Sequence, residues 1–330
     1  MQQEYTGLEY VKISVANAMG LDGETFKHRL DMFDKHVSMD SEGVYCDFED
    51  PKEPITLHKS LRAYEDVMND VPTGYIMGMD ATASGLQIMA VLSGCIKTAR
   101  ACNLVNTGKR ENAYALVAEK MNVKLPIHEF VGPKQVKKPT MTHFYNSIAK
   151  PRELLSTTQL IAFYEVLIDE FPGATDVMES VNGCWTNKDQ FKVTMPDGFV
   201  MLMRNFIKYH KDIEIFGHTF NYSWSEFGAN GNHLPLAANI THGTDGYVAR
   251  ELVMLCPFEV LIIHDCFYCS PNNMGAMREV YRQILAKIAR SELLQDILRQ
   301  ITGTDELIYN KVGDGELLAQ AILDSENAIC

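Results

Sequence analysis

Two apolar segments of this chain each end in an aspartate, and this pattern constrains the fold more than any other feature. Asp80 follows the segment 74–79, and Asp265 follows the segment 260–264. Each run predicts a strand whose carboxylate lies at the edge of a core, where desolvation is costly unless a cation compensates. Either aspartate alone would be an ordinary solvated strand end. Two such strands side by side would form a site for divalent metal ions, as used in phosphoryl transfer.

The size and composition of the chain fit a soluble globular protein. It has 330 residues, of which 46% are hydrophobic and 22% are charged, which suits one large domain or two closely joined ones. The sequence has no run of about 18 apolar residues that could span a membrane and no signal-peptide pattern at its start. The eight cysteines are scattered, so we expect reduced thiols and a cytoplasmic protein without a membrane partner.

Charge is distributed unevenly along the chain. The net charge is −13, and residues 1–80 carry seven Lys and Arg against sixteen Asp and Glu. Residues 93–152 reverse this balance, with eleven Lys and Arg against three Glu. A basic stretch inside an acidic chain is typical of a groove for a polyanion and equally of a solvated face. Charge alone therefore does not decide between these two interpretations.

Apolar periodicity and turn residues predict a mostly helical chain with a few strands. A loop is expected over residues 38–56, short strands over 180–225, and irregular chain beyond residue 303. Pro139 is compatible with the first turn of a helix that starts near residues 135–138. The helices are expected over residues 7–19, 24–37, 57–70, 84–92, 111–122, 135–145, 152–171, 233–255 and 275–301.

A basic segment begins one predicted helix between the two aspartates. Lys134, Lys137 and Lys138 lie at or just before its first turn, where unpaired N–H groups and the helix dipole favour an anion. Met141 and Tyr145 follow Lys137 at intervals of four residues, so these three side chains face one way. With metal ions nearby, the segment is typical of a nucleotide triphosphate site. Without them, it is typical of a solvated helix start with a core tyrosine.

Two histidines and a cysteine pair carry weaker signals. His242 lies on a predicted helix, where a single histidine is usually structural. His264 precedes Asp265 and is expected to face the opposite side of its strand. The pair Cys266 and Cys269 has no second cysteine or histidine pair to complete a zinc site, so we interpret it as incidental.

The segments around Asp80, residues 137–145 and residues 264–265, taken in this order, resemble motifs A, B and C of a known family. It is the single-subunit phage and mitochondrial RNA polymerase family, which is related more distantly to family A DNA polymerases. The resemblance implies an α+β right-hand fold, in which palm and fingers, mostly helical, surround a small antiparallel palm sheet. It extends to residues 80–87, 99–122, 242–246 and 323–325.

The family's organisation suggests domain boundaries for this chain. The expected parts are an N-terminal helical part of the palm (1–73), palm with motif A (74–115), fingers with the motif B helix (116–232), and palm with motif C and a C-terminal foot (233–330). The promoter-binding domain, the thumb and the Asp-x-x-Gly-Arg motif, which precede these parts in the family, do not precede Met1. We therefore expect the catalytic subunit of a split, heterodimeric phage RNA polymerase, located in the host cell cytoplasm. A smaller second subunit would supply the missing parts, and phage accessory factors would recruit the enzyme to promoters.

The resemblance also implies a role for each matching residue. Asp80 and Asp265 would hold two Mg²⁺ ions, with the backbone carbonyl of Ala81 as a further ligand. Lys137 would bind the incoming triphosphate, and Tyr145 would close on the nascent base pair, so the catalytic residues are Asp80, Lys137, Tyr145 and Asp265. His242 would act with Tyr145 in favouring a ribose. The expected nucleotide-binding residues are Lys134, Lys138, Met141, Tyr145, His242 and His264.

Two positions favour RNA over DNA as the product. Family A DNA polymerases place a glutamate five residues after the motif A aspartate, where it blocks a ribose 2′-OH, and here that position is Gly85. They also place a glutamate after the motif C aspartate, where this chain has Cys266. Other positions depart from the RNA polymerase pattern. Glycine, histidine, serine and arginine of that pattern are replaced by Asn146, Ile88, Cys266 and Pro133.

The sequence therefore predicts an enzyme, a DNA-directed RNA polymerase that is a nucleotidyltransferase. Its partners would be a DNA template, an RNA product, nucleoside triphosphates and the second subunit. One alternative is a fragment of a family A-like DNA polymerase, against which Gly85 and Cys266 argue. Another is a non-catalytic nucleic-acid-binding module, against which the intact Asp80, Lys137 and Asp265 argue.

Overall fold

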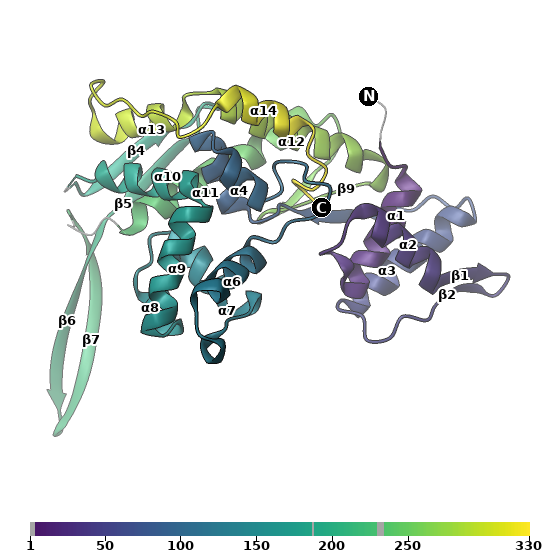
Figure 1. Cartoon of the computed structure of the whole chain (residues 1–330), viewed down its shortest axis with the longest axis horizontal. Helices are drawn as coiled ribbons and strands as arrows, with labels where there is room; N and C mark the ends of the chain where they lie inside the picture. The colour runs from purple at the N-terminus through teal and green to yellow at the C-terminus, as the bar shows by residue number, and fades with distance from the viewer. Residues whose placement is uncertain (1–3, 187, 230–233) are drawn as a thin grey trace.

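The computed structural model describes residues 4–186, 188–229 and 234–330 and is mostly helical (Figure 1). Its helices are α1 (Gly7–Ala16), α2 (Phe26–His36), α3 (Pro54–Met68), α4 (Ser84–Ser93), α5 (Ile96–Ala101), α6 (Ala113–Lys124), α7 (Pro133–Phe144), α8 (Ala149–Leu154), α9 (Thr157–Glu170), α10 (Pro172–Gly183), α11 (Leu234–Leu255), α12 (Met274–Arg290), α13 (Leu293–Thr302) and α14 (Gly315–Leu323), with a π-helical turn at Asn17–Leu21 and short 3₁₀ turns at Ile127–Glu129 and Pro271–Asn273. The strands are β1 (Val37–Asp40), β2 (Gly43–Cys46), β3 (Met77–Asp80), β4 (Gln190–Thr194), β5 (Val200–Arg204), β6 (Phe206–Ile215), β7 (His218–Phe227), β8 (Leu261–Ile263) and β9 (Cys266–Cys269). They form small antiparallel sheets, as predicted.

A three-stranded sheet with the order β3-β9-β8 holds both aspartates. Asp80 ends β3 as predicted, and it is aligned with Cys266 of β9. The expectation for Asp265 was wrong in detail, because β8 ends at Ile263 and Asp265 lies in the tight turn before β9. The strand beside β3 is therefore β9 and not the apolar run that precedes Asp265. His264 lies in the same turn with a φ of 56°, so it does not face the far side of a strand.

Helix α4 begins three residues after Ala81 and forms the centre of the hydrophobic core, where its residues from Leu86 to Ser93 are all buried. Buried Gln87 donates to the carbonyls of Cys102 (3.0 Å) and Ala328 (2.7 Å) and accepts from the hydroxyl of Tyr281 (2.7 Å). These bonds tie the residues just after Asp80 to the C-terminal segment. That segment also pairs with the edge of β3, since Cys330 N–H donates to the Asp80 carbonyl (3.0 Å).

The remaining differences from the expectation lie in local elements. The expected loop over 38–56 contains the β1–β2 hairpin, and α14 lies beyond residue 303, with Asp314 accepting from two backbone N–H groups at its start. The expected helices over 152–171 and 275–301 are each broken into two. The expected position of Pro139 was wrong, because α7 already begins at Pro133, so that Pro139 lies inside the helix and Lys137 and Lys138 lie beyond its first turn. His233, where a helix was expected to begin, lies outside the described residues.

A long hairpin extends from the body of the molecule (Figure 1). Its strands β6 and β7 pair from Phe206 with Phe227 to Ile215 with His218, and they are longer than the short pieces expected over 180–225. The eight cysteines are all free. No helix in the described part of the chain is long and apolar enough to cross a membrane.

Candidate active site

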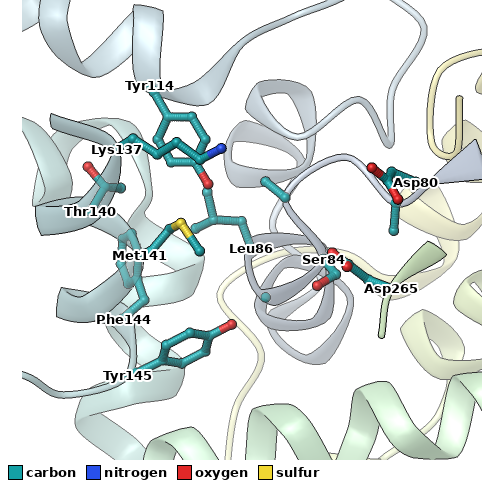
Figure 2. A pocket seen from close by; sticks show the side chains of 13 residues that line it. Asp80, Ser84, Leu86, Tyr114, Lys137, Thr140, Met141, Phe144, Tyr145 and Asp265 are labelled. Carbon is teal, nitrogen blue, oxygen red and sulfur yellow. The ribbon is translucent and has the colours of Figure 1, made fainter. Parts of the chain in front are cut away.

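One cavity of about 370 Å³ brings together residues that were singled out far apart in the sequence (Figure 2). Asp80 and Ala81 come from the end of β3, and Asp265 comes from the β8–β9 turn. The opposite wall is α7, which contributes the stripe Lys137, Met141 and Tyr145. The predicted spacing of four residues along this helix is the reason that the three side chains reach the same cavity. The cavity is also lined by Ala83, Ser84, Gly85, Leu86, Tyr114, Thr140 and Phe144.

The two carboxylates meet because the sheet places the ends of β3 and of the β8–β9 turn together. Ala81 N–H donates to the carbonyl of Asp265 at 3.0 Å, which fixes the backbones of both aspartates. Figure 2 shows Asp80 and Asp265 at one end of the cavity, opposite the α7 wall. Asp80 is exposed, Asp265 is half-buried, and both residues line the cavity.

This pair of carboxylates suits Mg²⁺ better than an enclosed metal. No group of three or more His, Cys, Asp or Glu that could hold a metal occurs among the residues that the structure describes. Mg²⁺ is commonly held by one or two carboxylates, with waters and substrate phosphates as its remaining ligands. The donor set at Asp80 and Asp265 would therefore fit a Mg²⁺ ion whose other ligands come from water or substrate.

Lys137 supplies the positive charge on the α7 side. Its Nζ lies 5.6 Å from the centre of the Tyr114 ring, and Figure 2 shows the amino group extending into the cavity. Burial, with smaller effects of Tyr145 and Asp265, raises the pKa of Tyr114 to about 12, so its hydroxyl stays protonated. The ring holds the ammonium group by a cation–π contact while leaving its N–H groups open to an anion.

Tyr145 ends α7 and lies against Gly85 and His242. Its ring centre is 4.7 Å from that of His242. A Cβ atom at Gly85 would lie only 2.8 Å from the Tyr145 hydroxyl oxygen, so the absence of a side chain at residue 85 gives room to this tyrosine. Burial, followed by the charges of Asp245 and Asp265, raises the pKa of Tyr145. The hydroxyl is thus a neutral hydrogen-bonding group at the cavity wall.

Four predicted nucleotide-binding residues do not line this cavity. Lys134 and Lys138 are exposed on α7, and His264 is exposed in its turn. His242 does not line it either and reaches the site through its contact with Tyr145. The structure thus brings together the four predicted catalytic residues, Ala81 and Met141.

The sequence did not single out several residues that line the cavity. Thr140 and Phe144 lie at intervals of three residues after Lys137 and Met141, so extending the helical stripe would have found them. Tyr114 comes from α6, and no local pattern connects it to Lys137. Asp245 of α11 does not line the cavity, and the sequence pointed to it only as part of the segment 242–246. Burial, together with the charge of Asp265, raises the pKa of Asp245 to about 6.

A second cavity, of about 640 Å³, also borders Asp80. One wall is the face of the three-stranded sheet with Gly78, Tyr268 and Leu261, which are neighbours across the strands. The other walls come from the N-terminal helices and the following chain, which add the cations Lys52, Lys59 and Arg110 and the acids Asp22 and Glu53. Asp80 therefore lies between two cavities.

Comparison with known proteins points to one family. Residues 2–154 match the family of DNA-dependent RNA polymerases. A Neurospora crassa protein named "Probable DNA-directed RNA polymerase" is 27% identical over 117 residues, which are 34% of this chain and 13% of that protein. The region that matches the family contains Asp80, Lys137 and Tyr145, while Asp265 lies outside it.

Proposed function

We propose, because the chain fits the family of DNA-dependent RNA polymerases, that it is a nucleotidyltransferase that synthesises RNA on a DNA template. The observation that carries the proposal is the single cavity shared by Asp80, Asp265, Lys137 and Tyr145. In the reaction, the 3′-OH of the RNA attacks the α-phosphorus of a nucleoside triphosphate. A new P–O bond forms, the bond to pyrophosphate breaks, and the hydroxyl proton is released to solvent.

Asp80 and Asp265 would hold two Mg²⁺ ions, with the Ala81 carbonyl as a further ligand. The bound ions would supply charge neutralisation at the reacting phosphate. The protein's own contribution is to hold the two carboxylates at one end of the cavity through the Ala81–Asp265 backbone bond of 3.0 Å. Such positioning of groups before the reaction is the main task of an enzyme in phosphoryl transfer.

Lys137 would bind the triphosphate and stabilise the charge that develops on it. Lys134 and Lys138 would attract the nucleotide from the exposed side of the same helix. Tyr145 lies two helical turns from Lys137, about 12 Å along the axis, which is close to the distance between a nucleotide's phosphates and its base. Met141 lies between them and would contact the sugar or the base.

The acceptor end of the RNA would occupy the second cavity. Asp80 lines both cavities, so a 3′-OH on one side and a triphosphate on the other would meet at this carboxylate. The proposal assigns the β3-β9-β8 sheet to a palm and the lobe of α6, α7, α8 and α9 to fingers. The boundaries predicted at residues 73, 115 and 232 remain part of this proposal.

We also infer that the chain acts as the catalytic subunit of a split phage polymerase. The acidic balance of residues 1–80 leaves little positive charge for gripping a nucleic-acid duplex, so a smaller partner with the thumb and the Asp-x-x-Gly-Arg motif would supply it. Accessory phage factors would recruit the complex to promoters. His242 and Tyr145 would favour a ribose, and His264 would contact the nucleotide from the β8–β9 turn.

Primer extension with ribonucleotides and deoxyribonucleotides tests the proposed function. The full chain, alone and with the subunit that co-purifies with it, is given an RNA primer on a DNA template and Mg²⁺. We expect extension by ribonucleotides and little or none by the chain alone. A preference for deoxyribonucleotides would favour a DNA polymerase, and binding of the primer–template without any extension would favour a non-catalytic module.

A further inference from the structure

Asn146, the residue after Tyr145, has an unusual backbone conformation for a side-chain-bearing residue. Its φ is 65°, in the left-handed region. Asn146 N–H donates to the carbonyl of His143 (2.7 Å), and Ser147 N–H donates to the carbonyl of Thr142 (2.9 Å). These two bonds are the pattern by which a helix commonly ends at a glycine, or less often an asparagine, with positive φ. The sharp end of α7 at Tyr145 therefore depends on the ability of residue 146 to adopt a positive φ.

The side chain of Asn146 uses this position to bind another helix. It is buried, and its amide donates to the Asn182 amide oxygen at 3.0 Å while accepting from the Asn182 nitrogen at 3.3 Å. Both asparagines thus satisfy each other with two hydrogen bonds. A glycine at residue 146 would allow the same backbone but could not make this contact.

Asn182 belongs to α10, which is packed tightly against α4 and α5, the two helices that follow Asp80 in the chain. A Cβ atom at Gly173 of α10 would lie 2.3 Å from the Ser93 hydroxyl and from the Cys95 Cβ. Gly173 N–H also donates to the Thr98 hydroxyl at 3.1 Å. Buried Val177 and Val181 continue the contact of α10 with the core. Helix α10 therefore gives the end of α7 a fixed attachment.

These contacts close a ring of three helices around Tyr145. Tyr145 occupies the space that a side chain at Gly85 of α4 would fill, and it is followed by Asn146. Asn146 binds α10, and α10 packs back on α4 and α5. We propose that Asn146 and Asn182 are a positioning pair that holds Tyr145 over Gly85 and so strengthens the preference for ribonucleotides over deoxyribonucleotides that Tyr145 would give the site. The inference rests on the proposed function. Neither asparagine lines the cavity that would hold the triphosphate, so both act through Tyr145.

Two single variants separate the amide pair from the backbone. Asn182→Ala removes the pair and leaves residue 146 unchanged, and Asn146→Gly removes it while keeping a residue that tolerates positive φ. The readout is the ratio of kcat/KM for ATP to kcat/KM for dATP in primer extension by the full chain with its partner subunit. We expect each variant to lower this ratio about fivefold, as for the loss of a buried hydrogen-bonded pair. The double variant should show no further loss, because both changes break the same contact.

Asn205→Ala is the matched control. Asn205 is also buried, and its amide donates to the carbonyl of Lys188 at 2.6 Å, but it lies outside the three-helix ring. We expect this variant to lower the thermal midpoint without changing the ratio. An unchanged ratio in Asn182→Ala, or an equal fall in Asn205→Ala, would overturn the positioning role and leave the proposed function intact. A wild-type complex that extends no primer, or that prefers dATP, would instead overturn the proposed function and the inference with it.

Discussion

The two cavities that meet at Asp80 are built from different chemistry. In the first, the ammonium group of Lys137 lies over a tyrosine ring on the wall opposite the two carboxylates. In the second, Lys52 is already paired with Asp22 at 3.0 Å, and the apolar side chains of Leu261 and Ile263 are about half exposed (51% each). The first cavity therefore offers a positive charge and two carboxylates, whereas the second offers balanced charge beside apolar surface.

This difference indicates which ligand each cavity suits. A triphosphate carries several negative charges and needs cations that are not already neutralised. The first cavity provides that through Lys137 and through the metal ions that Asp80 and Asp265 would hold. The second suits the sugar and base edges of a nucleic-acid strand, which are largely neutral. If the assignment is correct, equivalent substitutions in the two cavities will have unequal effects.

The largest expected effect is that of removing a carboxylate from the first cavity. Asp265→Asn, which keeps the shape but loses the charge, should lower kcat of the reconstituted complex by about 10³-fold or more. Single-turnover nucleotide addition across a Mg²⁺ titration measures it. Asp22→Asn removes a carboxylate from the second cavity and should lower kcat by less than about tenfold, because that group is paired with Lys52 at the surface. Full activity of Asp265→Asn would make the metal assignment wrong.

Lysines in the two cavities offer a second comparison. Lys137→Ala should lower kcat/KM for the nucleotide by about 10²-fold, because it removes the cation proposed to bind the triphosphate. Lys59→Ala should change this constant by no more than about threefold, since Lys59 lines only the second cavity. Steady-state kinetics at varied ATP concentration distinguish the two. Equal losses in both variants would mean that the triphosphate contacts both cavities.

Asp245 lies near the first cavity and not near the second. We expect its substitution to change the stability of the folded protein. Its pKa in the folded protein is raised to about 6 by burial and by Asp265, so folding favours the protonated form. The stability linked to the protonated carboxyl is fully present below its pKa in the unfolded chain, about 3.9, and is lost as the pH rises through 6. Asp245→Asn should therefore raise the free energy of unfolding by about 3 kcal/mol at pH 7.5 and by less than about 0.5 kcal/mol at pH 4.

Denaturant unfolding in EDTA at the two pH values measures this difference without interference from bound metal. Asp31→Asn on α2 is a surface control whose free energy of unfolding should stay within about 0.5 kcal/mol of wild type. A gain in Asp245→Asn that is equal at both pH values would show that the carboxylate is not held in its neutral form by burial.

The first cavity could be predicted from the sequence to the extent that its parts are local patterns. The stripe of Lys137, Met141 and Tyr145 follows from helix geometry. The same geometry turns Lys138 by about 100° from Lys137 and so places it outside the stripe. Asp80 was correctly placed because its strand ends in a tight turn before a helix. These signals depend only on residues within a few turns of one another.

The parts that could not be predicted depend on contacts between distant segments. The pairing of β3 with β9, which moves Asp265 into a turn, follows from packing across the sheet and not from the apolar run before it. Tyr114 reaches Lys137 only because α6 and α7 pack together. Asn146 was noted as a departure from glycine, but its partner Asn182 could not be identified from a single sequence.

A pair of glycines, one beside each cavity, gives the smallest and sharpest test of the comparison. Gly85→Ala would place a Cβ atom 2.8 Å from the Tyr145 hydroxyl oxygen, so the tyrosine must move, and we expect about a tenfold loss in kcat/KM for ATP. Tyr145→Phe in the same chain removes the oxygen that collides and should recover part of this loss. Gly78→Ala would place a Cβ atom 2.4 Å from the Tyr268 ring on the second cavity's wall. We therefore expect this variant to lower stability and to weaken binding of the primer strand. Pre-steady-state ATP addition and primer–template titration separate these outcomes, and a nucleotide defect in Gly78→Ala as large as in Gly85→Ala would remove the distinction between the cavities.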